Sequence, residues 1–594
     1  MSVSGRYPGW DFLACTDKSC SGESSKLFLI IVLSLTISFM SLASHAQGVE
    51  GAERVFFNAK VFTGVPERPY AEAVAIRGDK VVAVGNLPDV LEAASPTAQR
   101  IDLEGKTLLP GLIDSHVHPM MAGLSLVGAD VGDQVHSIDE LARFAADAKR
   151  AGKGMRGDVV YISGLPLEFW SHTDELNFHF SSGDFASVPL FLAGSDGHTS
   201  WGNRALLRRA GITKDYLSRL SAAEHAYYGV ANDGEPNGFA VDAGRNKLEA
   251  AVPPASKEQY LAGGRAALQY LQGLGITAWL DAWADESVLA TYKALADKGE
   301  LTAHVAAFWV VNPRNDPARE LETAQKIRRQ YAGTPNLTIP GIKVFADGVL
   351  EYPSQTAALT RPYRNDGHSG DLLFDPARFA ELAIAADKQG LIVHVHALGD
   401  RAVKEALSGI EAARKANGNS GLPHTLTHLQ IVDREDFPRF KQLGVIAAFQ
   451  LLWATADADA VDLVKPYIDP DLYRWQYPAR SLLDAGATIS GASDWSVSSP
   501  NVFWAIYQAE TRKGPEGVLD PSQRVPREAM FFAYTRNSAR ALNQQEKIGS
   551  LAAGMQADMV LVDRDVLTVS PEEMRDTKVL WTMIGGKTVY RAQP

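Results

Sequence analysis

The feature that most constrains the fold is a long middle region in which apolar, strand-like runs alternate with helical repeats. The strand-like runs include residues 276–280, 341–345 and 391–396, and helical periodicity follows over residues 376–389 and 400–417. Alternation of this kind predicts parallel strands joined by crossover helices. The number of repeats favours an α/β fold. We predict a (β/α)8 barrel of the TIM type that spans about residues 111–544.

Both ends of this region carry short β-strand patterns. Residues 73–76 and 81–84 flank a turn-like Arg77-Gly78-Asp79-Lys80, and residues 579–584 precede Gly585-Gly586. Such turns between strand-like runs predict hairpins. We therefore expect residues 50–110 and 545–594 to form one small β-sandwich domain built from both termini. Two unrelated β-patches are the alternative.

The stretch from about residue 131 to 255 is longer than one barrel crossover requires. A crossover that includes a helix needs little more than about a dozen residues. We therefore expect this stretch to be an insertion with its own packing. We predict that it covers one mouth of the barrel.

The N-terminal region is typical of an export signal. Lys26 precedes the apolar run of residues 27–42, and the small residues Ala43-Ser44-His45-Ala46 follow it. This layout predicts a cleaved signal peptide over residues 1–46 and a periplasmic or secreted protein. The run is close to the lower limit for a spanning helix, so an uncleaved membrane anchor is the alternative.

Composition excludes several classes of function. Cys15 and Cys20 are the only cysteines and precede the apolar run, so the mature chain would hold no disulfide, cysteine–zinc site or cysteine nucleophile. The formal net charge of −12 is poorly suited to nucleic acid, which is bound through many lysine and arginine contacts. We expect a small-molecule substrate, and we leave a homodimer open.

One histidine pair is a candidate metal site. His116 and His118 lie two residues apart near the end of an apolar run in PGLIDSHVHP, residues 110–119. Side chains two apart in a strand point to the same face, so the two imidazoles converge as a metal requires. Two histidines at this spacing are, by themselves, weak evidence for a metal site. This one lies where the first barrel strand would end.

Further candidate ligands follow at the ends of later strands. His394 and His396 share a strand face, and His396 is the expected ligand because it lies nearer the carboxyl end, where barrel active sites lie. His428 ends the next strand, whereas His424 lies deeper and is expected to be structural. Asp494 follows the last barrel strand and can bind a metal and accept a proton from water. A helix N-cap is its alternative role.

Lys343 lies between Ile342 and Val344 in an apolar strand. Burial of an unpaired ammonium group is costly, which favours the neutral amine. A neutral amine can react with carbon dioxide to give a carbamate, an anionic group with two oxygens. The alternative is an unmodified lysine paired with Asp347 or with a metal-bound anion.

The ordered motifs resemble the amidohydrolase superfamily, and within it the YtcJ-like group that includes N-substituted formamide deformylases. The resemblance covers about residues 55–590. No single motif is specific, but the ordered set is. It comprises PGLIDSHVHP, SDGHTSWGNRAL (195–206), GIKVFADG (341–348), HVHALGDRAV (394–403), HTLTHLQ (424–430) and GASDWSVSSP (491–500).

The resemblance implies a metal-dependent hydrolase that acts on carbon–nitrogen bonds other than peptide bonds. It implies one metal held by His116, His118 and Asp494, and a second held by His396 and His428. Carbamylated Lys343 would bridge the two metals, and Asp494 would serve as base and then as acid. Zinc is the expected ion, one or two per chain. The nearest alternative is a mononuclear deaminase or cyclic-amide hydrolase, and a non-catalytic binding protein is a more distant one.

The resemblance also suggests that Asp196, His198 and Trp201 border the substrate pocket, with packing inside the insertion as the alternative. Two positions depart from the family pattern. Thr427 stands where relatives commonly carry a glutamate, and Gln355 stands where they often carry an arginine. Neither change removes a predicted ligand. Both can reshape the pocket, so the sequence does not define the substrate beyond an amide-type bond.

Several tryptophans hint at an aromatic or apolar pocket. Core packing is the alternative explanation for most of them. They are Trp201, Trp279, Trp283, Trp453 and Trp495.

Overall fold

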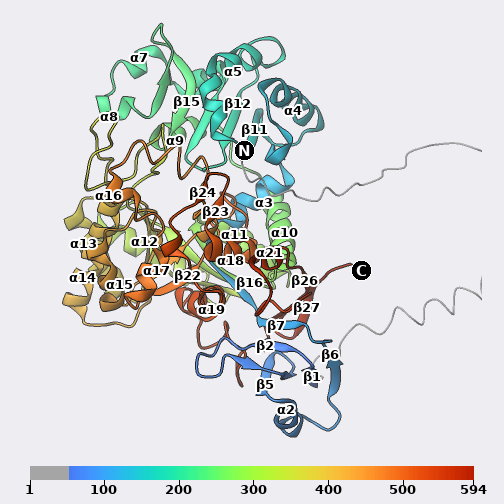
Figure 1. Cartoon of the computed structure of the whole chain (residues 1–594). Helices are drawn as coiled ribbons and strands as arrows, with labels where there is room; N and C mark the ends of the chain where they lie inside the picture. The colour runs from blue at the N-terminus through green and yellow to red at the C-terminus, as the bar shows by residue number, and fades with distance from the viewer. Residues whose placement is uncertain (1–52, 594) are drawn as a thin grey trace, which may run out of the picture.

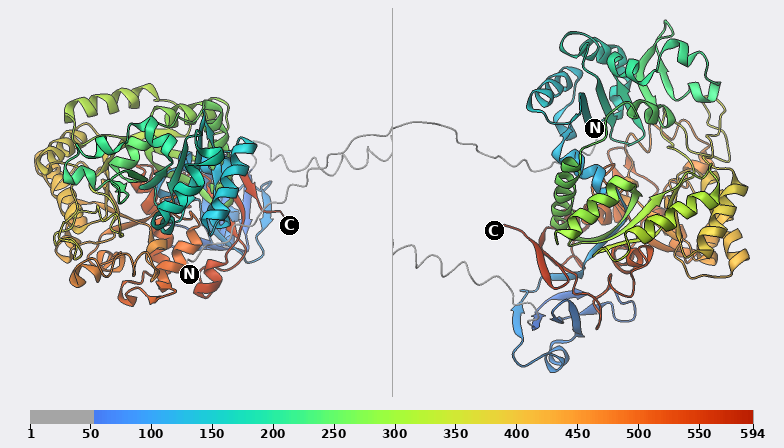
Figure 2. Two further views of the ribbon diagram at one scale, coloured as in Figure 1. Left: turned by 90° about the horizontal axis from the view of Figure 1, so that it is seen from above. Right: turned by 180° about the vertical axis from the view of Figure 1, so that it is seen from behind.

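The computed structural model describes residues 53–593 (Figure 1). The predicted signal peptide, residues 1–46, lies outside this range. Within residues 53–593, no helix is both long and apolar enough to cross a membrane. Figures 1 and 2 show three parts: a central barrel, the insertion at one end, and a strand-rich part at the other.

The central sheet is a nearly closed parallel barrel, which confirms the predicted fold class. At its seam, the hydroxyl of Ser115 lies 2.9 Å from Oγ of Ser490 and 2.8 Å from the carbonyl oxygen of Gly491. Its eight strands, in spatial order, are β8 (Leu112–Val117), β16 (Ile276–Ala284), β17 (His304–Val310), β18 (Leu337–Phe345), β19 (Ile392–Ala397), β20 (Thr425–His428), β21 (Ile446–Phe449) and β22 (Thr488–Gly491).

The crossover helices start at clear sequence signals. Asp316 and Asp375 each cap a helix by accepting a hydrogen bond from a backbone N–H, and a proline follows each of them in the first turn. Both features favour helix initiation. The principal helices around the barrel are α10 (Lys257–Gly273), α11 (Glu286–Asp297), α12 (Pro317–Gln330), α13 (Pro376–Lys388), α14 (Asp400–Asn417) and α18 (Val502–Thr511).

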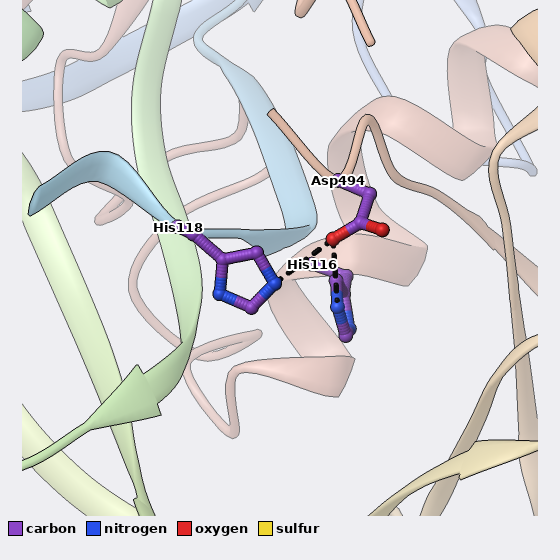
Figure 3. A group of neighbouring side chains, drawn as sticks. All are labelled: His116, His118 and Asp494. Atoms are coloured by element: carbon purple, nitrogen blue, oxygen red, sulfur yellow. Dashed lines mark ion pairs between the residues drawn. The ribbon is translucent and has the colours of Figure 1, made fainter. Parts of the chain in front are cut away.

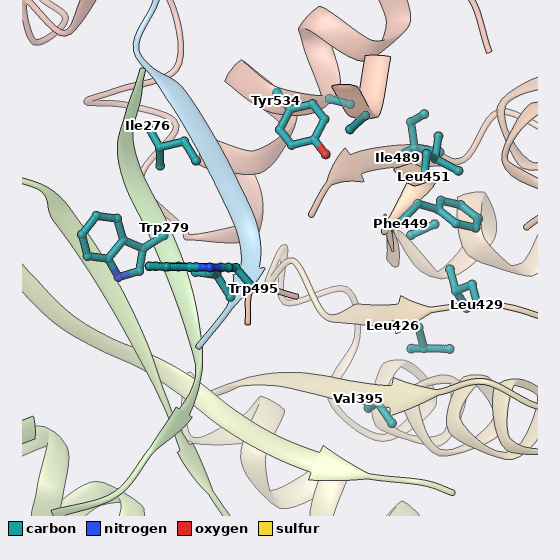
Figure 4. Packing of buried hydrophobic residues seen from close by; sticks show 14 of the residues in the cluster. Ile276, Trp279, Val395, Leu426, Leu429, Phe449, Leu451, Ile489, Trp495 and Tyr534 are labelled. Atoms are coloured by element: carbon teal, nitrogen blue, oxygen red, sulfur yellow. The ribbon is translucent and has the colours of Figure 1, made fainter. Parts of the chain in front are cut away.

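The barrel strands pack against these helices through a continuous apolar core, part of which is drawn in Figure 4. Ile342 and Val344 of β18 belong to this core. Because strand side chains alternate between faces, Lys343 between them points into the barrel. The labelled residues of Figure 4 are Ile276, Trp279, Val395, Leu426, Leu429, Phe449, Leu451, Ile489, Trp495 and Tyr534.

Strands from both chain ends share one six-stranded sheet. There β7 (Thr107–Pro110) pairs with β25 (Met559–Val562) and with β2 (Lys60–Phe62). The hairpin between β26 (Val579–Ile584) and β27 (Lys587–Arg591) turns at Gly585 and Gly586, whose φ of +54° and +73° favour glycine. The sheet is completed by β3 (Tyr70–Ala71), and a second sheet holds β5 (Lys80–Gly85), β4 (Ala73–Arg77), β1 (Glu53–Phe57) and β6 (Gln99–Asp102).

The insertion lies between β8 and β16 and has its own sheet and apolar core. The core includes Leu176, Phe180, Leu192 and Trp201. Its strands are β9 (Ala129–Asp130), β10 (Met155–Arg156), β11 (Val159–Leu165), β12 (Leu190–Gly194), β13 (Thr199–Gly202), β14 (Tyr228–Val230) and β15 (Pro236–Val241), and helices such as α4 (Ile138–Ala151), α5 (Thr173–Phe180) and α9 (Ala243–Glu249) cover them.

Asp387 of α13 joins α13 to Arg414 of α14 and to His424, the residue before β20, and these contacts show a structural role for His424. Nε2 of His424 lies 2.9 Å from Oδ1 of Asp387, and Nη1 of Arg414 lies 2.8 Å from the same oxygen. Burial opposes ionisation of Asp387, but hydrogen bonds from His424, Ser420 and Asn417 hold its pKa below its ordinary value. The carboxylate is therefore ionised in the folded protein at neutral pH.

Asp387→Asn is expected to lower the free energy of unfolding by about 3 kcal/mol at pH 7, because Arg414 would lose its buried counter-charge. The folded-state pKa is lowered, so this stabilisation is present above about pH 4 and is lost as the pH falls towards the folded pKa. Urea unfolding at pH 7 and pH 3.5 checks both statements. Asp297→Asn breaks an exposed pair with Lys293 and is the control, with an effect below about 1 kcal/mol. Equal losses in the two variants would contradict the prediction.

Candidate metal centre

His116, His118 and Asp494 meet at the carboxyl ends of β8 and β22 (Figure 3). Nε2 of His116 and Nε2 of His118 lie 3.2 Å and 2.9 Å from Oδ1 of Asp494. Two atoms that each lie about 2.1 Å from one tetrahedral zinc ion are about 3.4 Å apart. The three side chains therefore fit a single divalent ion.

The backbone around these ligands is fixed and partly strained. The N–H of Asp494 donates to the carbonyl oxygen of His116 over 2.8 Å, which ties the loop after β22 to β8. Asp494 and His428 have φ of +58° and +76°, the left-handed region that non-glycine residues rarely adopt. Such strain costs about 1–3 kcal/mol per residue and is typical of functional sites. Asp494 does not cap α18, since Asn501 does so.

Unpaired buried atoms around this group also fit a metal. Within residues 53–593, Nε2 of His116, Nδ1 of His428 and Nζ of Lys343 are buried without a hydrogen-bond partner. An unsatisfied buried polar group costs about 1–3 kcal/mol, so natural proteins rarely retain several in one place. A cation would satisfy the two ring nitrogens directly.

The charge states suit metal binding. Burial is the main cause that lowers the pKa of His116 and of His428, so both rings are neutral at pH 7 and offer a lone pair. Burial disfavours the ionised form of Asp494, but a hydrogen bond from His118 is the largest of the opposing effects, which lower the pKa of Asp494 to about 2. The site thus presents neutral imidazoles beside a carboxylate.

The remaining predicted ligands adjoin the same group. The ring centres of His396 and His428 are 4.5 Å apart, and those of His116 and His428 are 4.8 Å apart. Nδ1 of His428 lies 3.9 Å from Oδ2 of Asp494. Nε2 of His396 instead lies 3.2 Å from the carbonyl oxygen of Gly348. All five histidine and aspartate candidates thus form one cluster, whose tightest part is His116, His118 and Asp494.

Lys343 is fully buried beside this cluster. Burial lowers the pKa of its amine to about 7, so a large share is neutral at physiological pH. Its Nζ lies 4.7 Å from the ring centre of Phe345. Asp347 is not its partner, because the carboxylate of Asp347 accepts hydrogen bonds from the backbone N–H groups of Ala358, Leu398 and Gly399. The structure therefore does not show the alternative pairing of Lys343 with Asp347, since Nζ of Lys343 has no hydrogen-bond partner within residues 53–593.

His394 lies behind the metal-facing histidines. Its Nε2 is 2.6 Å from Nδ1 of His116, and the residue is fully buried. A hydrogen bond to the second ring nitrogen fixes the orientation and tautomer of a metal-binding histidine. His394 therefore positions His116 in this structure.

His394→Leu is expected to weaken metal binding by about 10- to 100-fold, because His116 would lose that hydrogen bond. Competition with a chelator of known affinity measures the change. His394→Gln retains a polar partner and should lose less. An unchanged metal dissociation constant in His394→Leu would contradict the positioning role.

The three insertion residues have different surroundings. Nδ1 of His198 lies 2.7 Å from Oδ1 of Asp242, and its ring centre is 5.8 Å from that of His396. Oδ1 of Asp196 accepts hydrogen bonds from the N–H groups of His198 and Thr199, so Asp196 shapes the turn that presents His198. Asp242 lies 44 residues beyond His198, and no local pattern identified it.

Trp201 corrects one prediction. It is fully buried in the core of the insertion, and its Nε1 donates to the carbonyl oxygen of Asn237 over 2.9 Å. Unlike Asp196 and His198, it does not line the cavity beside the metal site. The alternative reading, internal packing, therefore holds for Trp201, because its side chain faces the helices of the insertion.

A cavity of about 3990 Å³ lies between the barrel mouth and the insertion. The barrel contributes His396, His428 and Asp494 to its wall, and the insertion contributes Asp196 and His198. Pockets for small molecules commonly measure about 300–1,000 Å³, so this cavity is large enough for a substrate and for solvent around it. The candidate metal centre opens into this space.

Comparison with known proteins agrees with this architecture. The chain is 24% identical over 545 residues to the putative amidohydrolase YtcJ of Bacillus subtilis (strain 168), covering 89% of this chain and 98% of that protein. It is 24% identical over 561 residues to the N-substituted formamide deformylase of Arthrobacter pascens, covering 90% and 98%. An uncharacterized metal-dependent hydrolase from Pyrococcus horikoshii OT3 shares the fold, with a TM-score of 0.69, 23% identity and coverage of 88% and 99%.

A family model described as "Amidohydrolase family" matches residues 99–590. The match includes the barrel, the insertion and the C-terminal strands. It covers every candidate ligand of the metal centre. The chain therefore belongs to the amidohydrolase family, in the YtcJ-like group.

Proposed function

We propose that this protein is a metal-dependent hydrolase that cleaves an amide-type carbon–nitrogen bond of a small molecule. The observation that carries the proposal is the convergence of His116, His118 and Asp494 beside a large cavity in a member of the amidohydrolase family. The relative named as an N-substituted formamide deformylase supports an amide-type substrate.

His116, His118 and Asp494 would hold one ion, and His396 and His428 would hold a second. A carboxylated Lys343 would join the two. Zinc suits imidazole and carboxylate ligands with an open position. When bound, such an ion lowers the pKa of a coordinated water to about 7 and polarises a carbonyl oxygen.

The protein's own groups carry the proton. Asp494 takes a proton from the attacking water, whose oxygen bonds to the carbonyl carbon, and returns it to the nitrogen as the carbon–nitrogen bond breaks. The contacts of Asp494 with His116 and His118 orient its carboxylate. His198, held by Asp242, contacts the substrate from the insertion side of the cavity.

The test is a screen of metal-loaded protein against N-acyl, N-formyl and cyclic amides, with bound metals quantified on the same sample. We expect hydrolysis of at least one class and zinc in the active sample. Two equivalents of metal per chain support the dinuclear site, whereas one equivalent of metal supports the mononuclear alternative. Carefully purified protein that binds no metal and hydrolyses no amide would overturn the proposal.

We also propose that the protein is exported. Lys26, the apolar run of residues 27–42 and the small residues that follow support this location. N-terminal sequencing of protein recovered from the periplasm or medium tests it. A mature chain that begins shortly after Ala46 is expected, and protein retained in the cytoplasm would argue against export.

A further inference from the structure

The loop that carries Asp494 is held by individual contacts and not by regular secondary structure. Residues 492–494 follow β22 and belong to no helix or strand. The N–H of Ser493 donates to Oδ1 of Asp114 over 3.1 Å, and the N–H of Asp494 donates to the carbonyl oxygen of His116. Because the left-handed φ of Asp494 is strained, the loop keeps this shape only while surrounding groups impose it.

Tyr534 supplies one such contact from the C-terminal part of the chain. Its side chain is buried, and its hydroxyl donates to the carbonyl oxygen of Ala492, two residues before Asp494, over 3.2 Å (Figure 4). The ring lies against Gly491 at the end of β22, where an added Cβ would come within 2.5 Å of ring carbons. The glycine therefore permits the close approach that lets the hydroxyl reach the loop.

The segment around Tyr534 is also fastened to β22. Tyr534 belongs to a π-helical turn, Ala533–Asn537, a rare conformation that occurs frequently at functional sites. Nδ2 of Asn537 donates to the carbonyl oxygen of Ile489 in β22 over 3.0 Å. Phenylalanine would fill the apolar space of Tyr534 without a hydroxyl that needs a partner when buried. Core packing alone therefore does not account for the hydroxyl.

We propose that Tyr534 is a positioning residue for Asp494. Its hydroxyl holds the carbonyl group of Ala492, and through this bond it fixes the backbone that presents the Asp494 carboxylate to His116 and His118. The catalytic consequence rests on the proposed function, whereas the contact itself does not. A reacting group displaced by about 1 Å can cost about 100-fold in rate, so a loosened loop should be detectable in turnover.

The test uses Tyr534→Phe, which removes the hydroxyl and keeps the ring. Tyr363→Phe is the matched control. Tyr363 is also buried, its hydroxyl donates to the carbonyl oxygen of Ala357 over 3.0 Å, and it lies outside the cavity lining. Because both variants lose the same kind of hydrogen bond, urea unfolding should show similar decreases in stability.

The two variants should differ at the metal centre. In metal-free protein, we expect hydrogen exchange of residues 492–495 to be about tenfold faster in Tyr534→Phe and unchanged in Tyr363→Phe, as mass spectrometry of the corresponding peptides measures. Chelator competition should show a metal dissociation constant raised about 3- to 10-fold in Tyr534→Phe alone. At saturating metal, kcat should fall about tenfold while KM stays within about twofold, since the proposed change acts on Asp494 and not on substrate binding.

One set of outcomes tests the positioning role while the proposed function stands. If exchange of residues 492–495, metal affinity and kcat in Tyr534→Phe match those in Tyr363→Phe, the positioning role is overturned. Faster exchange without any change in metal affinity or kcat also overturns it, because the loop would then loosen without displacing Asp494.

The inference remains testable even if the proposed function fails. If the wild-type protein neither binds metal nor hydrolyses an amide, the function falls and the exchange rates decide. Faster exchange confined to residues 492–495 in Tyr534→Phe then supports the positioning of this loop by Tyr534. Exchange rates equal to those of Tyr363→Phe overturn it.

Discussion

Asp494→Asn is expected to lower kcat by about 10²- to 10⁴-fold while the fold remains intact. Asparagine has nearly the same shape, but its amide can neither accept a proton from water nor contribute a negative charge beside His116 and His118. Both rings now lie within 3.2 Å of Oδ1 of Asp494, so the substitution acts on the tightest part of the site. Steady-state kinetics on the best amide of the screen, with circular dichroism and metal analysis, measures the effect.

Asp371→Asn is the matched control for this experiment. Asp371 is an exposed carboxylate that lines the same cavity and is not one of the candidate ligands. The control should therefore keep kcat within about twofold, since substitutions away from special features rarely change a protein much. Full activity in Asp494→Asn would rule out Asp494 as the proton-transferring group.

Lys343→Met is expected to abolish detectable turnover and at the same time stabilise the metal-free protein. Methionine fills a similar apolar space but cannot form a carbamate, so the bound metal should also decrease. Removal of a fully buried amine without a hydrogen-bond partner should raise the free energy of unfolding by about 1–3 kcal/mol. Metal analysis, kinetics and urea unfolding of metal-free protein measure the three effects.

The stability gain should depend on pH in a defined direction. Burial lowers the folded-state pKa of Lys343 to about 7, whereas an unfolded lysine has a pKa of about 10.4. The unfolded chain therefore binds the extra proton between these values, and the wild-type protein gains stability as the pH rises from about 7 to about 10. The advantage of Lys343→Met should be larger at pH 6 than at pH 9.

An exposed lysine provides the control for stability. Lys326 on α12 is exposed, and Lys326→Met should change the free energy of unfolding by less than about 0.5 kcal/mol at either pH. If Lys343→Met retained turnover, Lys343 could not be the group that bridges the two metals. A loss of stability in the metal-free variant would show that the buried amine contributes favourable contacts.

Strand and helix positions were predictable to a large extent because periodicity is a local property. The expected helix over residues 400–417 coincides with α14 (Asp400–Asn417), and the strand over 276–280 lies inside β16 (Ile276–Ala284). Spacing by two residues also indicated that His116 and His118 share a face. Local spacing could not indicate that Nδ1 of His116 meets Nε2 of His394, because that contact depends on the order of strands around the barrel.

The sequence by itself determined which elements form, in what order, and which histidines and carboxylates could reach the carboxyl ends of the strands. Only the tertiary structure decided that Trp201 is buried while Trp283 faces the cavity, and that Asp242 holds His198. The physical reason is that the alternation of side chains between the two faces of a strand depends on neighbouring residues alone, so the sequence reveals it directly. Contacts between distant segments depend on sheet register and on the path of the insertion, which no short stretch of sequence encodes.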